Sequence, residues 1–166
     1  MKIRLLLLAG LVAWSASGQA GAGEPQTLPT VEACFVSQNG GTGHPLLLET
    51  AQTVAERRIG LMWREQLEEG TGMLFSYPSE RSPENGFWMY NTHIPLDIAF
   101  LDDNGVIVSI RQMEPCLASN PRQCPSYPAG RFFWHAVETN AGYFKENGLK
   151  PGDRLEWPVT RDQCED

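Results

Sequence analysis

Residues 96–110 read LDIAFLDDNGVIVSI, and this stretch decides the fold. Apolar side chains stand at positions 96, 98 and 100, the alternation of a strand with one buried face. Asp103-Asn104-Gly105 follows and supplies the residue types that favour a tight turn. The alternation resumes at positions 106, 108 and 110. The stretch therefore predicts an antiparallel β-hairpin, around which the rest of the fold is expected to assemble.

Shorter strand signals lie on both sides of this hairpin, separated by Gly, Pro and Asn. The candidate strands are residues 31–37, 45–50, 72–77 (ended by Pro78), 86–90, 131–138 and 154–159. Thr53 and Glu56 match a capping box at the start of one short helix. Thr139 or Asn140 is expected to start a second helix, which ends at Gly148. The sequence therefore predicts a mainly β (α+β) fold, a compact antiparallel β-barrel-like domain with two short helices.

The first 22 residues have the order of a secretory signal peptide. Lys2 and Arg4 precede an apolar run from Leu5 to Trp14, and small residues follow it. A retained membrane anchor is disfavoured, because a spanning helix needs about 20 apolar residues. We expect a signal peptide over 1–22, a polar leader over 23–30 and a single β-rich domain over 31–166. The protein is then exported, to the periplasm or the extracellular space.

The charge balance bears on the class of partner. The chain has 13 basic and 20 acidic side chains, a formal net charge of −7. Residues 1–22 hold two of the basic side chains and no acidic one, so their removal leaves a charge of −9. Nucleic-acid binding depends on neutralising phosphates with Lys and Arg, so the composition argues against it. It argues equally against docking on anionic lipid, and no later segment is apolar enough to insert stably into a membrane.

The four cysteines are Cys34, Cys116, Cys124 and Cys164. An even number in an exported protein indicates disulfides, and four cysteines allow three pairings. We favour Cys116–Cys124, which brackets a Pro-rich loop, and Cys34–Cys164, which joins the two ends of the domain. The spacing does not fit a zinc site. A redox-active Cys116–Cys124 pair is the alternative to a structural one, although its spacing is not of the thioredoxin type.

Several blocks of this chain, taken in order and spacing, resemble one family. The blocks are GLMWR (60–64), GMLF (72–75), FWMYNT (87–92), IPLD (94–97), FLD (100–102), PC (115–116), CP (124–125), Tyr127 and GLKPGD (148–153). Together they resemble the domain of unknown function 192 family of bacteria and archaea. The resemblance covers about residues 46–156 and implies a small β-barrel-like fold. It implies no activity, since the family has none established. Tyr90 departs from the family pattern, which often has a basic residue there.

Polar and aromatic side chains gather in the block from residue 87 to residue 97. Trp88 offers a face for stacking, and Asn91 and Asp97 offer hydrogen-bonding groups that can orient a ligand. Arg64 or a run of backbone N–H groups is a candidate partner for the Asp97 carboxylate, and His93 is the nearest histidine. The best-supported hypothesis is a periplasmic ligand-binding or accessory module for a small polar or glycan-like ligand. Its predicted ligand-binding residues are these five, and it needs no cofactor.

Two alternatives remain open at this point. His93 and Asp97 form a candidate acid–base pair for a hydrolase or lyase. Met62, Met73, Met89 and Met113, together with three histidines, suggest Cu(I), which prefers soft ligands. These methionines lie in apolar blocks, where methionine usually fills a core. The sequence contains no nucleophile elbow, zinc-protease helix or phosphate-binding glycine loop, so it does not decide whether the protein is an enzyme.

Overall fold

The structure is a computed structural model that describes residues 23–165, and the expected signal peptide lies outside the described residues. The strands are β1 (Thr30–Val36), β2 (His44–Ala51), β3 (Thr71–Arg81), β4 (Gly86–Trp88), β5 (Leu96–Leu101), β6 (Ile107–Met113), β7 (Ser126–Pro128), β8 (Phe133–Asn140) and β9 (Arg154–Glu156). The helices are α1 (Val54–Ile59), α2 (Tyr143–Glu146), α3 (Arg161–Glu165) and the 3-10 turn Pro121–Gln123. Over residues 23–165, no helix has the length and apolar character that crossing a membrane requires.

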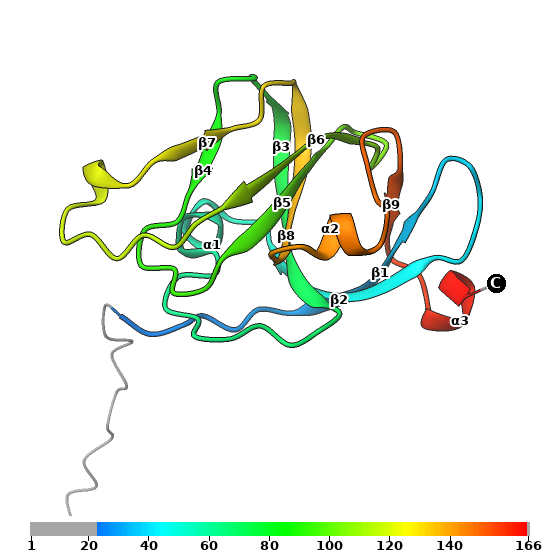
Figure 1. Ribbon diagram of the computed structural model, residues 1–166, viewed down its shortest axis with the longest axis horizontal. Helices are drawn as coiled ribbons and strands as arrows, with labels where there is room; N and C mark the ends of the chain where they lie inside the picture. Colours follow the sequence, from blue (N-terminus) through cyan, green and yellow to red (C-terminus); the bar gives the residue numbers. More distant parts are fainter. Residues whose placement is uncertain (1–22, 166) are drawn as a thin grey trace, which may run out of the picture.

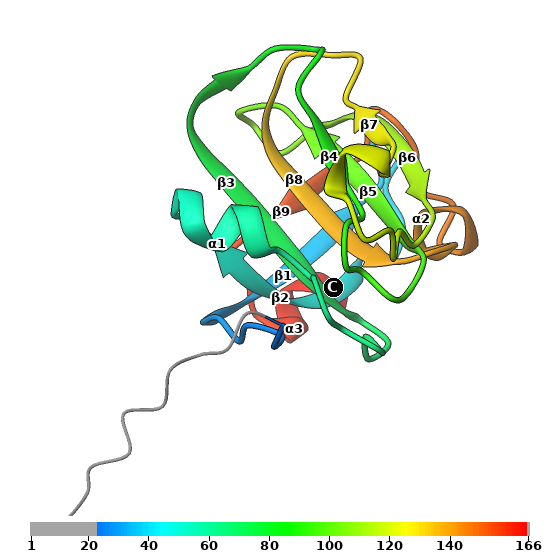
Figure 2. The ribbon, with the colours of Figure 1, turned by 90° about the vertical axis from the view of Figure 1, so that its left-hand side faces the viewer.

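Seven strands form one curled sheet in the order β6-β5-β8-β3-β2-β1-β9 (Figures 1 and 2). Neighbouring strands run antiparallel except β2 and β3, which are parallel. The curl brings the two end strands together. Ile107 N–H donates to the Asp153 carbonyl at 2.8 Å, and Leu155 N–H donates to the Gly105 carbonyl at 2.9 Å. The predicted mainly β, barrel-like fold is therefore confirmed.

The sheet has a core on each of its two faces, because successive side chains of a strand point to opposite sides. The inner core draws residues from all seven strands and includes Phe35, Leu74 and Val137. The outer core includes Phe75 and Phe100 and is completed by residues outside the seven strands. Figure 1 shows α1, β4 and β7 gathered on one side of the molecule, away from α2 and α3. This second layer creates the space in which the candidate site lies.

Two local predictions are confirmed in detail. The capping box of α1 is present: Thr53 Oγ1 accepts from Glu56 N–H at 3.2 Å, and Glu56 Oε2 accepts from Thr53 N–H at 2.8 Å. The hairpin is formed by β5 and β6, and Asp102 Oδ1 accepts from the backbone N–H of Asn104 and of Val106. Both motifs depend on residues close in sequence, so a local pattern suffices to predict them.

Strand β3 does not end at Pro78, and that prediction is wrong. The strand continues to Arg81, and its register with β8 is irregular between Ser76 and Arg81. A proline has no N–H to donate to a neighbouring strand. At a bulge the extra residue is unpaired, so no donor is needed there. Pro78 therefore lies inside a strand rather than at its end.

Helix α2 begins later than predicted. Its N-cap is Gly142, because Thr139 and Asn140 both belong to strand β8. The Asn140 side chain donates from Nδ2 to the Leu67 carbonyl at 2.9 Å instead of capping a helix. The assignment of Thr139 or Asn140 as the cap is therefore wrong. Helix α3 adds a third short helix to the two that were predicted.

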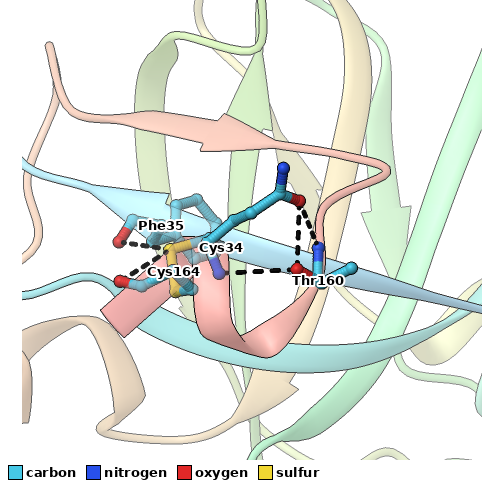
Figure 3. Close-up of a disulfide and its surroundings, with 5 residues drawn as sticks. Cys34, Phe35, Thr160 and Cys164 are labelled. Atoms are coloured by element: carbon cyan, nitrogen blue, oxygen red, sulfur yellow. Dashed lines mark hydrogen bonds between the residues drawn. A yellow bond between two sulfur atoms is a disulfide. The ribbon is translucent and has the colours of Figure 1, made fainter. Parts of the chain in front are cut away.

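Both predicted disulfides are present. The Cα atoms of Cys34 and Cys164 are 5.6 Å apart, and those of Cys116 and Cys124 are 5.8 Å apart. Figure 3 shows Cys164 on α3 bonded to Cys34 on β1, with Thr160 at the start of the helix. The first bridge therefore attaches the C-terminal helix to the sheet, and the second closes a short loop before β7.

Candidate functional site

The centre of the candidate site is Glu138, an acidic residue within a buried strand. It lies on β8, where its register partners are Met73 on β3 and Ile98 on β5. Partners in register place their side chains on the same face of a sheet. The Glu138 side chain therefore lies on the outer face, between apolar neighbours, and only 4% of the residue is exposed.

Glu138 lines a narrow cavity of about 20 Å³ between the sheet and the second layer. We call it the Glu138 cavity. A single water molecule needs roughly 10–15 Å³, so this space admits a group of about that size. Its other lining residues are Arg57, Arg58, Ile59, Gly60, Leu61, Met62, Phe75, Phe87, Trp88 and Thr92. The walls combine apolar side chains with two arginines and a threonine, and Glu138 supplies a carboxyl group from the sheet.

Burial raises the pKa of Glu138 to about 8. Within residues 23–165, no hydrogen bond or ion pair to its carboxyl group offsets the loss of hydration. Removal from water disfavours the charged form of an acid, so the carboxyl group is mostly protonated at neutral pH. A protonated carboxyl group both donates and accepts a hydrogen bond. Glu138 can therefore bind a neutral polar group in the cavity.

Trp88 and Thr92 form one side of the cavity, on β4 and in the turn after it. Trp88 is 40% exposed, and its ring lies 5.6 Å from the ring of Tyr90, measured between centroids. Thr92 is buried. The arrangement combines an exposed aromatic face at the mouth of the cavity with polar groups inside, which is typical of ligand sites.

A backbone contact joins the two sides of the Glu138 cavity. Trp63 N–H, after α1, donates to the Asn91 carbonyl at 2.6 Å. Both residues have positive φ, 62° for Trp63 and 55° for Asn91. Residues other than glycine rarely adopt this conformation, and surrounding contacts must hold it. The segment after α1 and the turn after β4 are therefore fixed against each other beside the cavity.

The other predicted site residues lie in different places. Arg64 pairs with Glu49 at 2.5 Å and lines a separate cavity of about 260 Å³. His93 is exposed. Asp97 is buried on β5 and accepts a hydrogen bond from Gly142 N–H at 2.9 Å. The structure brings Trp88 to the Glu138 cavity, with Asn91 in the adjoining turn, and does not bring Arg64, His93 or Asp97 there.

The Asp97 carboxyl group holds the start of α2. Burial raises its pKa, and hydrogen bonds from the backbone of Gly142 and Phe144 oppose that rise. Within the described part of the chain, no hydrogen bond joins Asp97 to His93.

Replacing Asp97 with Ala is expected to lower the free energy of unfolding by about 1–3 kcal/mol, because Gly142 N–H loses its acceptor in a partly buried place. Urea denaturation measures this change. Asp97→Asn keeps a side-chain oxygen and is expected to retain most of the stability. Equal stability of wild type and Asp97→Ala would contradict this role for Asp97.

Sequence reasoning predicted the strand that carries Glu138 but did not select the residue. The signal was an acidic residue at the end of the mostly apolar segment from Phe133 to Val137, on the same side of the strand as Ala136. An acid is costly to bury, and this holds for Glu138 as it does for Asp97. What the sequence did not show is which face of β8 the second layer covers.

The methionines lie mainly in the outer core. Met73, Met89 and Met113 pack there, and Met62 lines the Glu138 cavity. Among residues 23–165, no group of three or more His, Cys, Asp or Glu side chains could hold a metal ion.

The fold and the site define a class of small proteins, in which a curled β-sheet carries a second layer over a buried acid. The family model of DUF192, described as "Uncharacterized ACR", matches residues 35–157. The match covers more than half of the chain, and the chain belongs to the DUF192 family.

Two solved structures are similar to this chain. A protein of Sinorhizobium meliloti 1021, named as a proposed transcription regulator, is 30% identical with a TM-score of 0.69. The alignment covers 80% of this chain and 97% of that one. A protein of unknown function from Novosphingobium aromaticivorans DSM 12444 is 32% identical with a TM-score of 0.64, and the alignment covers 89% and 100% of the two chains. No curated protein matches the chain.

Proposed function

We propose that this protein is an exported ligand-binding module, which binds a small polar, glycan-like molecule at the Glu138 cavity. One observation carries the proposal. The carboxyl group of Glu138, which has no hydrogen-bonding partner among residues 23–165, opens into a cavity whose mouth has an exposed tryptophan. A buried polar group without a partner costs free energy, and a ligand that supplies the partner recovers it.

The geometry supports a division of roles between the mouth and the interior of the cavity. A sugar ring has faces of C–H groups, which pack on the exposed face of Trp88. The interior admits only a small group, such as one hydroxyl, to hydrogen-bond with Glu138. Arg58 is exposed at the mouth and can meet an acceptor on the rest of the ligand. Most of the ligand then lies outside the cavity.

The sequence and the disulfides support export. Two disulfides and no free cysteine in residues 23–165 suit an oxidising compartment. The basic and apolar start of the chain supports a periplasmic or extracellular location. The regulator name of the Sinorhizobium protein does not suit this chain, because a net charge of −7 disfavours nucleic acid.

Sugar binding is tested by thermal shift and titration calorimetry at pH 6 with N-acetylglucosamine, its short oligomers, glucose and galactose. A ligand that binds the folded state alone raises its melting temperature. Trp88→Ala is expected to weaken binding about tenfold, roughly 1.4 kcal/mol, because the stacking face is lost.

The matched control is Phe132→Ala. Phe132 is also an exposed aromatic residue, at 57%, but it does not line the Glu138 cavity. This variant is expected to bind as wild type does. Equal weakening in both variants, or the absence of a thermal shift with every sugar, would count against the proposal.

A further inference from the structure

The loop closed by the Cys116–Cys124 disulfide lies directly against the segment that carries Trp88. Asn91 N–H donates to the Cys116 carbonyl at 2.9 Å, and Cys116 N–H donates to the Met89 carbonyl at 3.2 Å. These two bonds hold the segment from one end of the loop.

The other end of the loop holds the same segment. Strand β7 begins two residues after Cys124 and pairs with β4, where Ser126 is the register partner of Trp88. Figure 1 shows the loop in yellow at the edge of the molecule, continuing into β7 beside β4. The disulfide therefore joins the two pieces of chain that hold Trp88 at the mouth of the Glu138 cavity.

The two disulfides differ in access to solvent. Cys34 and Cys164 are buried, at 1% and 4% exposure, whereas Cys116 and Cys124 are both partly exposed. Leu117, next to Cys116, is 61% exposed and offers an apolar contact beside the bond. Thiol–disulfide exchange requires access to a sulfur atom, so a reductant reaches the loop disulfide first.

We propose that the Cys116–Cys124 disulfide is a thiol–disulfide exchange site, at which a dithiol reductant releases the loop and weakens ligand binding at Trp88. The effect on binding rests on the proposed function, whereas the exchange reaction does not. With the bridge intact, loop and strand hold Trp88 beside the cavity. With the bridge open, only the backbone hydrogen bonds of Cys116 and the pairing of β7 with β4 still hold the segment, and the loop between them is free to move.

A thiolate of the dithiol attacks one cysteine sulfur, a mixed disulfide forms, and the other cysteine leaves as a thiolate that takes up a proton. The second thiolate of the reductant attacks the mixed disulfide at the reductant's own sulfur. The protein cysteine leaves and is protonated in turn. Two electrons pass to the protein, which gains two thiols, and the dithiol becomes a cyclic or intramolecular disulfide.

The exchange is tested on the disulfide-bonded protein with limiting dithiothreitol at pH 7.5. Free thiols are then trapped with iodoacetamide and located by mass spectrometry. We expect Cys116 and Cys124 to be alkylated at least tenfold faster than Cys34 and Cys164. Equal rates for the two pairs, or faster reaction of the buried pair, would overturn the exchange site.

The effect on the site is tested by hydrogen–deuterium exchange over residues 86–92. Reduction and the variant Cys116→Ala/Cys124→Ala are both expected to raise amide exchange there at least tenfold, while the exchange of β1 stays unchanged. Unchanged amide hydrogen exchange over residues 86–92 in either form would contradict the claim that opening the disulfide releases the loop.

Ligand binding is measured separately, by titration with N-acetylglucosamine. Affinity is expected to fall at least tenfold in the reduced protein. Equal affinity in both forms would show that the Cys116–Cys124 disulfide does not control ligand binding. If N-acetylglucosamine binds neither form, the proposed function fails for that sugar, and the alkylation and exchange results still decide the redox site.

Discussion

Replacing both Cys34 and Cys164 with Ala is expected to lower the free energy of unfolding by about 5 kcal/mol. The bridge joins residues 130 positions apart, and a closed loop of this length strongly restricts the unfolded chain. Both cysteines are also buried, so their replacement removes packed sulfur atoms from the contact between α3 and β1. Urea denaturation of the oxidised proteins at pH 7 measures the difference.

The second disulfide provides a matched control. The bridge between Cys116 and Cys124 spans 8 positions, so Cys116→Ala/Cys124→Ala is expected to cost only about 2.5 kcal/mol. The two losses should therefore differ by about a factor of two. If the long-range pair costs no more than the short-range pair, restriction of the unfolded chain is not the main contribution of the Cys34–Cys164 bridge.

The parts of the fold that the sequence predicts are those specified by neighbouring residues. The β5–β6 hairpin follows from an alternating pattern and a turn, and α1 follows from Thr53 and Glu56. The disulfide pairing was also predicted, because each bridge suited a simple geometric role. Pro78 shows the limit of such reasoning, since β3 continues past it through an irregular stretch of its pairing with β8.

The parallel pairing of β2 with β3 and the site depend on contacts that a local pattern does not contain. Glu138 becomes the centre of a cavity only because residues from α1, β4 and the following turn cover the outer face of the sheet. Trp88 was selected as an aromatic side chain on a strand face that could line a groove, whereas Asp97 was selected as an acid in an apolar strand and instead holds α2. Both acids fit the same pattern, and only the tertiary structure shows which one faces the cavity.

Replacing Glu138 with Gln is expected to make the protein more stable than wild type at pH 9, by as much as roughly 5 kcal/mol. The pKa of Glu138 is raised from 4.5 to about 8 by burial, and each unit corresponds to about 1.36 kcal/mol. Between these two values, the unfolded chain has released a proton that the folded chain still binds. Stability therefore falls as pH rises through this interval, and the contribution of protonated Glu138 is fully present only below pH 4.5.

Gln has nearly the shape of a protonated Glu and does not titrate, so the variant should not lose stability as the pH rises through this interval. We expect equal stability of the two proteins, within about 1 kcal/mol, at pH 4.5, and a difference that grows from pH 5 to about pH 8 and then levels off. Urea denaturation across this range measures it. The matched control is Glu68→Gln, an exposed position where the difference from wild type should stay small at every pH.

The same titration tests the chemistry of the proposed binding site. If the stability difference between Glu138→Gln and wild type does not change with pH, Glu138 has the same charge in the folded and unfolded chains. The carboxyl group would then be ionised at neutral pH and could only accept hydrogen bonds. A sugar hydroxyl can donate to a carboxylate, but the uncompensated buried charge would favour a cationic ligand instead. The pH dependence of folding therefore decides which class of ligand the Glu138 cavity suits, before any ligand is known.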